Sequence, residues 1–191
     1  MDIHFKAQSP EAVTLAVWPD NNPLFTDSLA HLITEINVIN RVEDFLFVNF
    51  CIDNFIYFIH DEWLEKLNKS GLRGVLVIDR FMHSLANYWR EKQQDIILLS
   101  VGDRDLTSFV SALNSLSYGQ SRVLEDVMPI TEKEIFVLRK RLSGMSVRNI
   151  ALTLNCSVKS IYYCQYSLLK KLRRSSRIGE IYIHHSHVHE T

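Results

Sequence analysis

Short apolar runs and amphipathic helical stretches alternate along the first part of the chain. Apolar runs rich in β-branched and aromatic residues occur at residues 12–18, 45–50, 74–79 and 95–102. Runs of this length and type predict buried strands. Residues 24–39, 53–68, 81–92 and 105–116 instead space their apolar positions as one face of a helix. Strands that alternate with helices predict a parallel sheet covered by helices, and thus an α/β domain.

The pattern changes beyond residue 116, and from Ile130 onward it is helical. We therefore place an α/β domain at residues 1–120, a linker at 121–129 and an all-α domain at 130–191. In the second domain, Thr131 followed by Glu134 has the spacing of a capping box at a helix start. Gly144 has the place of a glycine that follows a helix end.

Two further short helices follow within the all-α domain. Ser146 begins the first, whose inward positions are Val147, Ile150, Ala151 and Leu154. Ser157 is a candidate N-cap for the second, which we expect to bury Val158, Ile161, Leu168 and Leu172. Two helices joined by so short a turn predict a helix-turn-helix, whose second helix enters the major groove of DNA.

Polar and aromatic residues cluster on the N-terminal half of that second helix. The candidates for contacts to base edges are Ser157, Lys159, Ser160, Tyr162, Tyr163, Gln165 and Tyr166. Arg148, Lys159, Lys170 and Arg173 are suited to phosphate groups. A plain helical bundle with a basic outer face is the alternative interpretation of the same pattern. Packing against a neighbouring helix is likewise the alternative role of each tyrosine.

Charge is distributed unevenly between the two domains. Residues 1–129 carry 10 Lys and Arg against 18 Asp and Glu, a net charge of −8. Residues 130–178 carry 11 Lys and Arg against two acids, a net charge of +9. A module this basic within a nearly neutral chain indicates a polyanion as its partner.

Many specific positions over residues 130–172 fit one known pattern. They are Ile130, Thr131, Glu134, Val137, Leu138, Gly144, Ser146, Ile150, Ala151, Leu154, Ser157, Lys159, Ser160, Ile161, Lys171 and Leu172. In these positions the segment resembles the DNA-binding domain of LuxR/FixJ-type regulators, which implies DNA binding. Asn149, Tyr162 and Cys164 depart from the residues usual in that family, so its site preferences do not carry over.

The stretch 15–33 resembles the start of the receiver domains of response regulators. Asp20 fills the first place of the family's acid pair, Asn21 replaces the second, and Asn49 stands where the family has its phosphate-accepting Asp. An amide is a poor phosphoryl acceptor, and a phosphoryl group needs a bound cation. The resemblance therefore implies an inactive phosphorylation site. Only 29 positions separate Asp20 from Asn49, which predicts a shortened receiver that lacks one strand–helix unit.

These observations predict a cytoplasmic, phosphorylation-independent regulator that binds double-stranded promoter DNA as a homodimer or as a heterodimer with another regulator. The stretch LANYW at 85–89 and the layout of the chain resemble fimbrial and capsule regulators of enteric bacteria, which implies control of surface-structure genes. The alternative is an auxiliary interaction subunit that binds DNA only with a partner regulator.

Other function classes find no support in the sequence. It contains no glycine-rich phosphate loop, G-x-S-x-G or H-E-x-x-H motif, so we expect neither an enzyme nor a cofactor. The three cysteines do not have the spacing of a disulfide framework or a zinc site. We interpret the histidines at 184, 185, 187 and 189 as a terminal tail, not as a metal site. No apolar run is long enough for a membrane span, and the first residues lack the features of a secretory signal.

Overall fold

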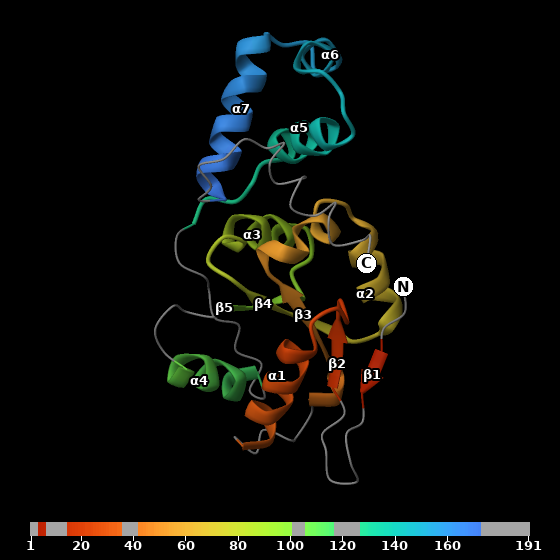
Figure 1. Ribbon diagram of the computed structural model, residues 1–191, viewed down its shortest axis with the longest axis vertical. Helices are drawn as coiled ribbons and strands as arrows, with labels where there is room; N and C mark the ends of the chain where they lie inside the picture. The colour runs from red at the N-terminus through yellow and green to blue at the C-terminus, as the bar shows by residue number, and fades with distance from the viewer. Residues whose placement is uncertain (1–3, 7–14, 36–41, 101–105, 117–126, 173–191) are drawn as a thin grey trace.

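The computed structural model describes residues 4–6, 15–35, 42–100, 106–116 and 127–172 (Figure 1). Its first part contains a five-stranded sheet whose spatial order follows the chain. The strands are β1 (His4–Lys6), β2 (Leu15–Trp18), β3 (Phe45–Phe50), β4 (Arg73–Ile78) and β5 (Ile97–Ser100). Strands β2 to β5 are parallel, as predicted, whereas β1 pairs antiparallel with β2. The edge strand β1 was not predicted.

Helices cover both faces of this sheet (Figure 1). Helices α1 (Pro23–Glu35) and α4 (Leu106–Leu116) pack on one face against Val75 and Val77 of β4. Helices α2 (Glu62–Ser70) and α3 (His83–Lys92) pack on the other face against Leu76 and Ile78. Because both faces are covered, the central strands are buried along nearly their whole length, as is typical of parallel sheets.

The connection through α1 has an unusual hand. Strands β2 to β5 lie in chain order, so each connection moves in the same direction across the sheet. Since α1 lies on the face opposite α2 and α3, its connection has the opposite hand to theirs. Crossover connections between parallel strands of one sheet are right-handed in about 98% of cases.

The missing strand–helix unit accounts for this exception. In the flavodoxin-like order 2-1-3-4-5, the first helix leads to an edge strand on the far side of strand 1. In this protein β1 occupies that edge, and it comes from the chain before β2. The predicted shortened receiver is thus confirmed in its fold.

The predicted helix at 53–68 is wrong in its first half. The chain forms a 3₁₀ helix, η2 (Ile52–Phe58), and α2 begins only at Glu62. The carbonyl groups at the break have partners from elsewhere in the protein. Trp89 Nε1 donates to the Phe58 carbonyl over 2.8 Å, and Arg139 donates to the Ile59 carbonyl. In a continuous helix, backbone amides further along the helix would donate to these two carbonyl groups. Here the two side chains donate in their place. A second 3₁₀ turn, η1 (Val42–Asp44), precedes β3.

The second part consists of helices α5 (Glu132–Leu142), α6 (Val147–Thr153) and α7 (Val158–Lys171). The Thr131 capping box is confirmed, and Ser146 and Ser157 are N-caps as predicted. Gly144 follows α5 with a φ of 82°, a backbone conformation that favours glycine. The small core of the three helices contains Val137, Ile150, Ala151 and Ile161.

The helical part docks on the α3 side of the α/β part, and the two share one buried apolar cluster (Figure 1). Five aliphatic side chains of the helical part belong to this cluster, together with Phe58 and Trp89: Ile130, Ile135, Leu138, Leu168 and Leu172. Asn87 Nδ2 donates to the Val127 carbonyl over 2.9 Å at the same junction. Among the described residues, no helix is both long and apolar enough to span a membrane.

Candidate nucleic-acid interface

The turn between α6 and α7 is built from local hydrogen bonds. Ser157 Oγ accepts from the Ser160 backbone amide over 3.1 Å at the start of α7. Asn155 adopts a φ of 47°, a left-handed conformation that asparagine tolerates better than most residues. Residues 154–157 join the two helices, and both helices bury their inner faces against α5. The predicted helix-turn-helix is present.

Helix α7 has sharply different faces. Ile161 and Leu168 are fully buried, whereas Tyr162, Tyr163 and Tyr166 are 58%, 73% and 68% exposed. We call Lys159, Tyr162, Tyr163, Tyr166 and Lys170 the tyrosine stripe. Tyr162 and Tyr163 are adjacent, each lies three or four positions from Lys159 and from Tyr166, and Lys170 lies four beyond Tyr166, so the five residues lie along one side of the helix. All five are exposed. The alternative in which each tyrosine packs against a neighbouring helix finds no support in these exposures.

The other predicted contact residues differ in their accessibility. Ser160 and Gln165 are half-buried, and the Ser160 hydroxyl lies 3.0 Å from the Ser157 hydroxyl. These two serines therefore have a structural role in the helix cap, in addition to their predicted role in DNA contacts. Arg148 is exposed on α6. Arg173 lies outside the described residues.

The prediction was wrong for one apolar residue, Val158, and did not include another, Leu152. Val158, predicted to be buried, is 42% exposed because it occupies the first turn of α7, at the end farther from the shared cluster. Leu152 is 73% exposed on α6. Its spacing of four residues from Arg148 predicts this exposure, since both lie on the outer face of that helix. Leu152 is therefore a candidate interface residue that was not predicted.

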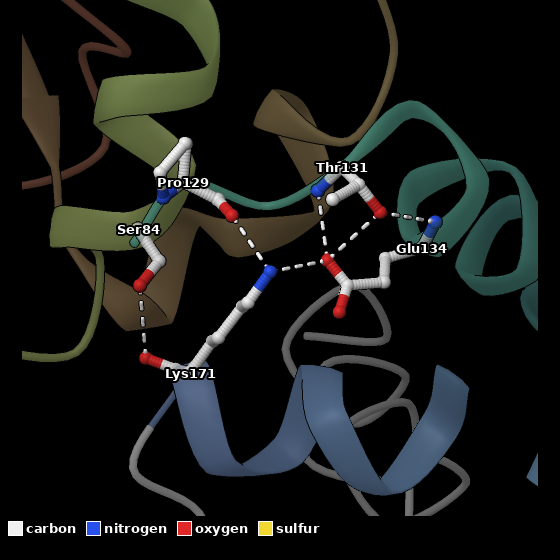
Figure 2. A network of polar contacts seen from close by, with 5 residues as sticks. All are labelled: Ser84, Pro129, Thr131, Glu134 and Lys171. Carbon is white, nitrogen blue, oxygen red and sulfur yellow. Dashed lines mark hydrogen bonds and ion pairs between the residues drawn. The ribbon is translucent and has the colours of Figure 1, made fainter. Parts of the chain in front are cut away.

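The C-terminal end of α7 is anchored at the junction between the two parts (Figure 2). Lys171 Nζ lies 2.7 Å from Glu134 Oε2 and 2.7 Å from the Pro129 carbonyl oxygen. The same Glu134 oxygen accepts from the Thr131 amide over 2.7 Å. Ser84 Oγ, from α3, donates to the Lys171 carbonyl over 3.2 Å.

The Glu134–Lys171 pair is a buried ion pair. The side chains are only 6% and 13% exposed, respectively. Burial opposes the charged form of Glu134, but hydrogen bonds from Lys171, Thr131 and Ser167 outweigh it and lower the pKa of the carboxyl group. Removal of one partner would leave the other charge without compensation inside the protein.

This anchoring directs the N-terminal half of α7 away from the α/β part (Figure 1). The junction contacts involve the end of the helix around Leu168, Lys171 and Leu172. The tyrosine stripe begins at the opposite end. In the part of the chain that the structure describes, the α/β domain leaves the stripe accessible to solvent.

The residues of the predicted inactive phosphorylation site gather at the carboxyl ends of the parallel strands. Asp20 and Asn21 are exposed, and Asn21 Nδ2 donates to Asn54 Oδ1 over 2.7 Å. Asn54 Nδ2 in turn donates to the Asn49 carbonyl over 3.0 Å, and Asn49 is 5% exposed. Amide groups therefore stand at two of the three predicted positions, Asn21 and Asn49, and Asp20 supplies the only carboxylate among the three.

A carboxylate nearby has a structural role. Asp79 Oδ2 accepts from the Ile52 amide over 2.7 Å, and Oδ1 accepts from the amides of Phe81 and Met82. Asp79 thus ties the loop after β3 to the loop after β4. No group of three or more His, Cys, Asp or Glu among the described residues is arranged to hold a metal ion. The C-terminal histidines lie outside these residues.

Comparison with known families assigns both parts of the chain. Residues 2–117 match the family model of the EcpR N-terminal domain. The chain belongs to this family. After the EcpR N-terminal domain, residues 128–183 match the luxR family of bacterial regulatory proteins. The chain is therefore a LuxR-type DNA-binding regulator with an EcpR N-terminal domain.

Individual relatives are more distant. The uncharacterized protein YqeH of Escherichia coli K12 is 27% identical over 167 residues, which are 87% of this chain and 79% of that protein. A structure of two RcsB dimers bound to two parallel DNAs is 17% identical, with a TM-score of 0.47, and the match covers 85% of this chain and 93% of that one. A structure of the Salmonella typhimurium RcsB response regulator is 18% identical, with a TM-score of 0.34, over 87% and 96% of the two chains.

Proposed function

We propose that this protein is a sequence-specific transcriptional regulator that binds promoter DNA through the tyrosine stripe of α7. The observation that carries the proposal is the exposure of Tyr162, Tyr163 and Tyr166 on the second helix of a helix-turn-helix. A soluble helix that presents three large aromatic rings to solvent needs a partner surface. Lys159 and Lys170 flank the rings, and their charge suits DNA phosphates.

Regulation without phosphorylation is part of this proposal. The side chain at the end of β3 is an amide, Asn49, and it is buried. Asn21 carries an amide instead of a carboxylate, and this amide donates to Asn54. The accessibility of the tyrosine stripe supports the same conclusion, because DNA can reach the stripe without displacement of the α/β domain.

A homodimer is the assembly that we favour, because helix-turn-helix regulators commonly read paired half-sites with paired subunits. A heterodimer with another regulator satisfies the same geometry. We place the protein in the cytoplasm, where promoter DNA is found. The resemblance to enteric fimbrial and capsule regulators supports genes for surface structures as targets.

The test is retention of fragmented genomic DNA from the host by the full-length protein, at two salt concentrations, followed by sequencing. Discrete enriched sites are expected, and their neighbouring genes identify the targets. Lys159→Ala should weaken all sites and reduce the dependence of binding on salt, whereas Tyr162→Ala should relax the sequence motif. Lys69→Ala on α2 and Leu24→Ala on α1 remove exposed side chains of the α/β domain and should change neither property.

An auxiliary subunit is the competing function. Its signature would be weak, salt-labile retention of DNA without enriched sites, because a partner would then supply the specificity. Light scattering of the protein alone and with candidate regulators separates a homodimer from a subunit of a heterodimer. Enrichment of discrete sites by the protein alone would rule out the auxiliary role.

A further inference from the structure

The tyrosine stripe is poor in the side chains that read most bases. Guanine is typically read by Arg or Lys, adenine by Asn or Gln, and cytosine by Asp or Glu. Among these types, the stripe holds only Lys159 and Lys170. Gln165, the nearest amide on α7, is half-buried. The stripe therefore has few groups for hydrogen-bonded readout of adenine or cytosine.

The stripe is rich in aromatic surface. The thymine C5 methyl group is the apolar group on the major-groove edge of the bases, and apolar side chains recognise it by contact. We infer that α7 selects its sites through thymine methyl groups that contact the rings of Tyr162, Tyr163 and Tyr166. This inference rests on the proposed function and specifies which chemistry of the DNA carries the sequence information.

The spacing of the rings sets the length of the thymine-dependent segment. Four residues separate Tyr162 from Tyr166, a rise of about 6 Å along the helix axis. Base pairs follow one another at about 3.4 Å. The three rings therefore cover about two base-pair steps. Burial of one methyl group contributes about fourfold to affinity, so two covered methyl groups contribute about sixteenfold.

Lys159 is the competing reader, because it lies at the start of α7 and a lysine can bind guanine O6 and N7. The two possibilities differ in the DNA atom that matters. Replacement of thymine by uracil removes the C5 methyl group and leaves the hydrogen-bonding pattern intact. Replacement of guanine by 7-deazaguanine removes the N7 acceptor and leaves every thymine methyl group intact.

The experiment begins with selection of duplexes from a random pool by the full-length protein. The best duplex is then prepared in three forms: unmodified, with uracil for thymine, and with 7-deazaguanine for guanine. The expected result is a loss of affinity of about fourfold to sixteenfold for each half-site with uracil and a smaller loss with 7-deazaguanine. Tyr162→Ala, Tyr163→Ala and Tyr166→Ala should each reduce the uracil effect.

Two matched variants isolate the role of the rings. Tyr162→Phe keeps the ring and loses the hydroxyl group, so it should retain the uracil effect. Leu24→Ala removes a 79% exposed apolar side chain from α1 and should also retain it. Circular dichroism verifies that each variant is folded.

Three outcomes would overturn the inference. Equal affinity for the unmodified and uracil duplexes, with a loss on 7-deazaguanine, would assign readout to Lys159. A selected motif without thymine on either strand would refute thymine recognition, but it would still support the proposed sequence-specific regulator. Selection without any motif would refute the proposed function as well, which distinguishes the two failures.

Discussion

The buried Glu134–Lys171 pair makes a quantitative prediction about stability. Lys171→Met keeps the aliphatic part of the side chain and removes the ammonium group. The Glu134 carboxylate, 6% exposed, would lose its only cationic partner within 4 Å among the described residues. The Pro129 carbonyl would lose its donor as well.

The expected cost follows from these contacts. Removal of one partner of a buried ion pair costs about 3–5 kcal/mol. The Thr131 amide and hydroxyl still donate to Glu134 in the variant, over 2.7 and 3.0 Å. We therefore expect a cost near the low end, about 3 kcal/mol of unfolding free energy. An exposed ion pair would contribute about 1 kcal/mol or less.

Urea unfolding at pH 7, followed by circular dichroism, measures this cost. Lys170→Met is the matched control, since Lys170 is the preceding residue of α7 and is exposed. It should change stability by less than about 0.5 kcal/mol. A double-mutant cycle with Glu134→Gln separates the coupling of the pair from the individual effects. A Lys171→Met cost that equals the Lys170→Met cost would refute the buried-pair argument.

The pH dependence has a definite sign. The folded pKa of Glu134 lies below its ordinary value, so its ionisation stabilises the protein above the unfolded pKa of about 4.3. That stabilisation is lost as the pH falls through the lower, folded pKa. The destabilisation by Lys171→Met should therefore be complete near neutral pH and should shrink in acid. A cost that is independent of pH would show that lost packing, not charge, is responsible.

Three further predictions concern other parts of the protein. Ser157→Ala removes the N-cap of α7, and urea unfolding should show a loss of about 1 kcal/mol, whereas Ser157→Asp should retain most of the stability. Gly144→Ala should cost about 1–2 kcal/mol of unfolding free energy in the same assay, because a φ of 82° strains any residue that has a side chain. The cost comes from the backbone alone, since nothing lies within 4 Å of the added Cβ. Gly144→Asn should cost less. Incubation with acetyl phosphate and Mg²⁺ should leave the mass of the intact protein unchanged, because Asn49 replaces the acceptor carboxylate. An increase in mass by one phosphoryl group that maps to Asp20 or Asp79 would contradict phosphorylation independence.

Locally determined features of this protein could be predicted from its sequence. The strand Phe45–Phe50 has the predicted bounds, because five of its six residues are apolar and the charged pair Glu43 and Asp44 precedes it. The N-caps Thr131, Ser146 and Ser157 were also predictable, since a cap depends on residues within the first helical turn. The helix-turn-helix and its exposed tyrosines follow from such local signals.

Features that depend on distant contacts could not be predicted. Strand β1 has three residues, and it exists through its register with β2, where Phe5 pairs with Ala16. The break before α2 depends on donors from Trp89 and Arg139, which lie 31 and 80 residues further along the chain. The docking of α7 through Ser84 joins residues 87 positions apart. No local periodicity contains this information.

The apolar cluster shared by the two parts has a consequence for modularity. Five side chains of the helical part are at most 1% exposed in the whole chain and share a cluster with Phe58 and Trp89: Ile130, Ile135, Leu138, Leu168 and Leu172. Transplantation of the helix-turn-helix onto another scaffold would remove the contacts with Phe58 and Trp89, so the new scaffold would have to supply an apolar surface in their place. Among the described residues, the exposed stripe makes no contact with this junction, so substitutions there leave the docking of α7 unchanged. Substitutions at the last turn of α7 must instead remain compatible with α3.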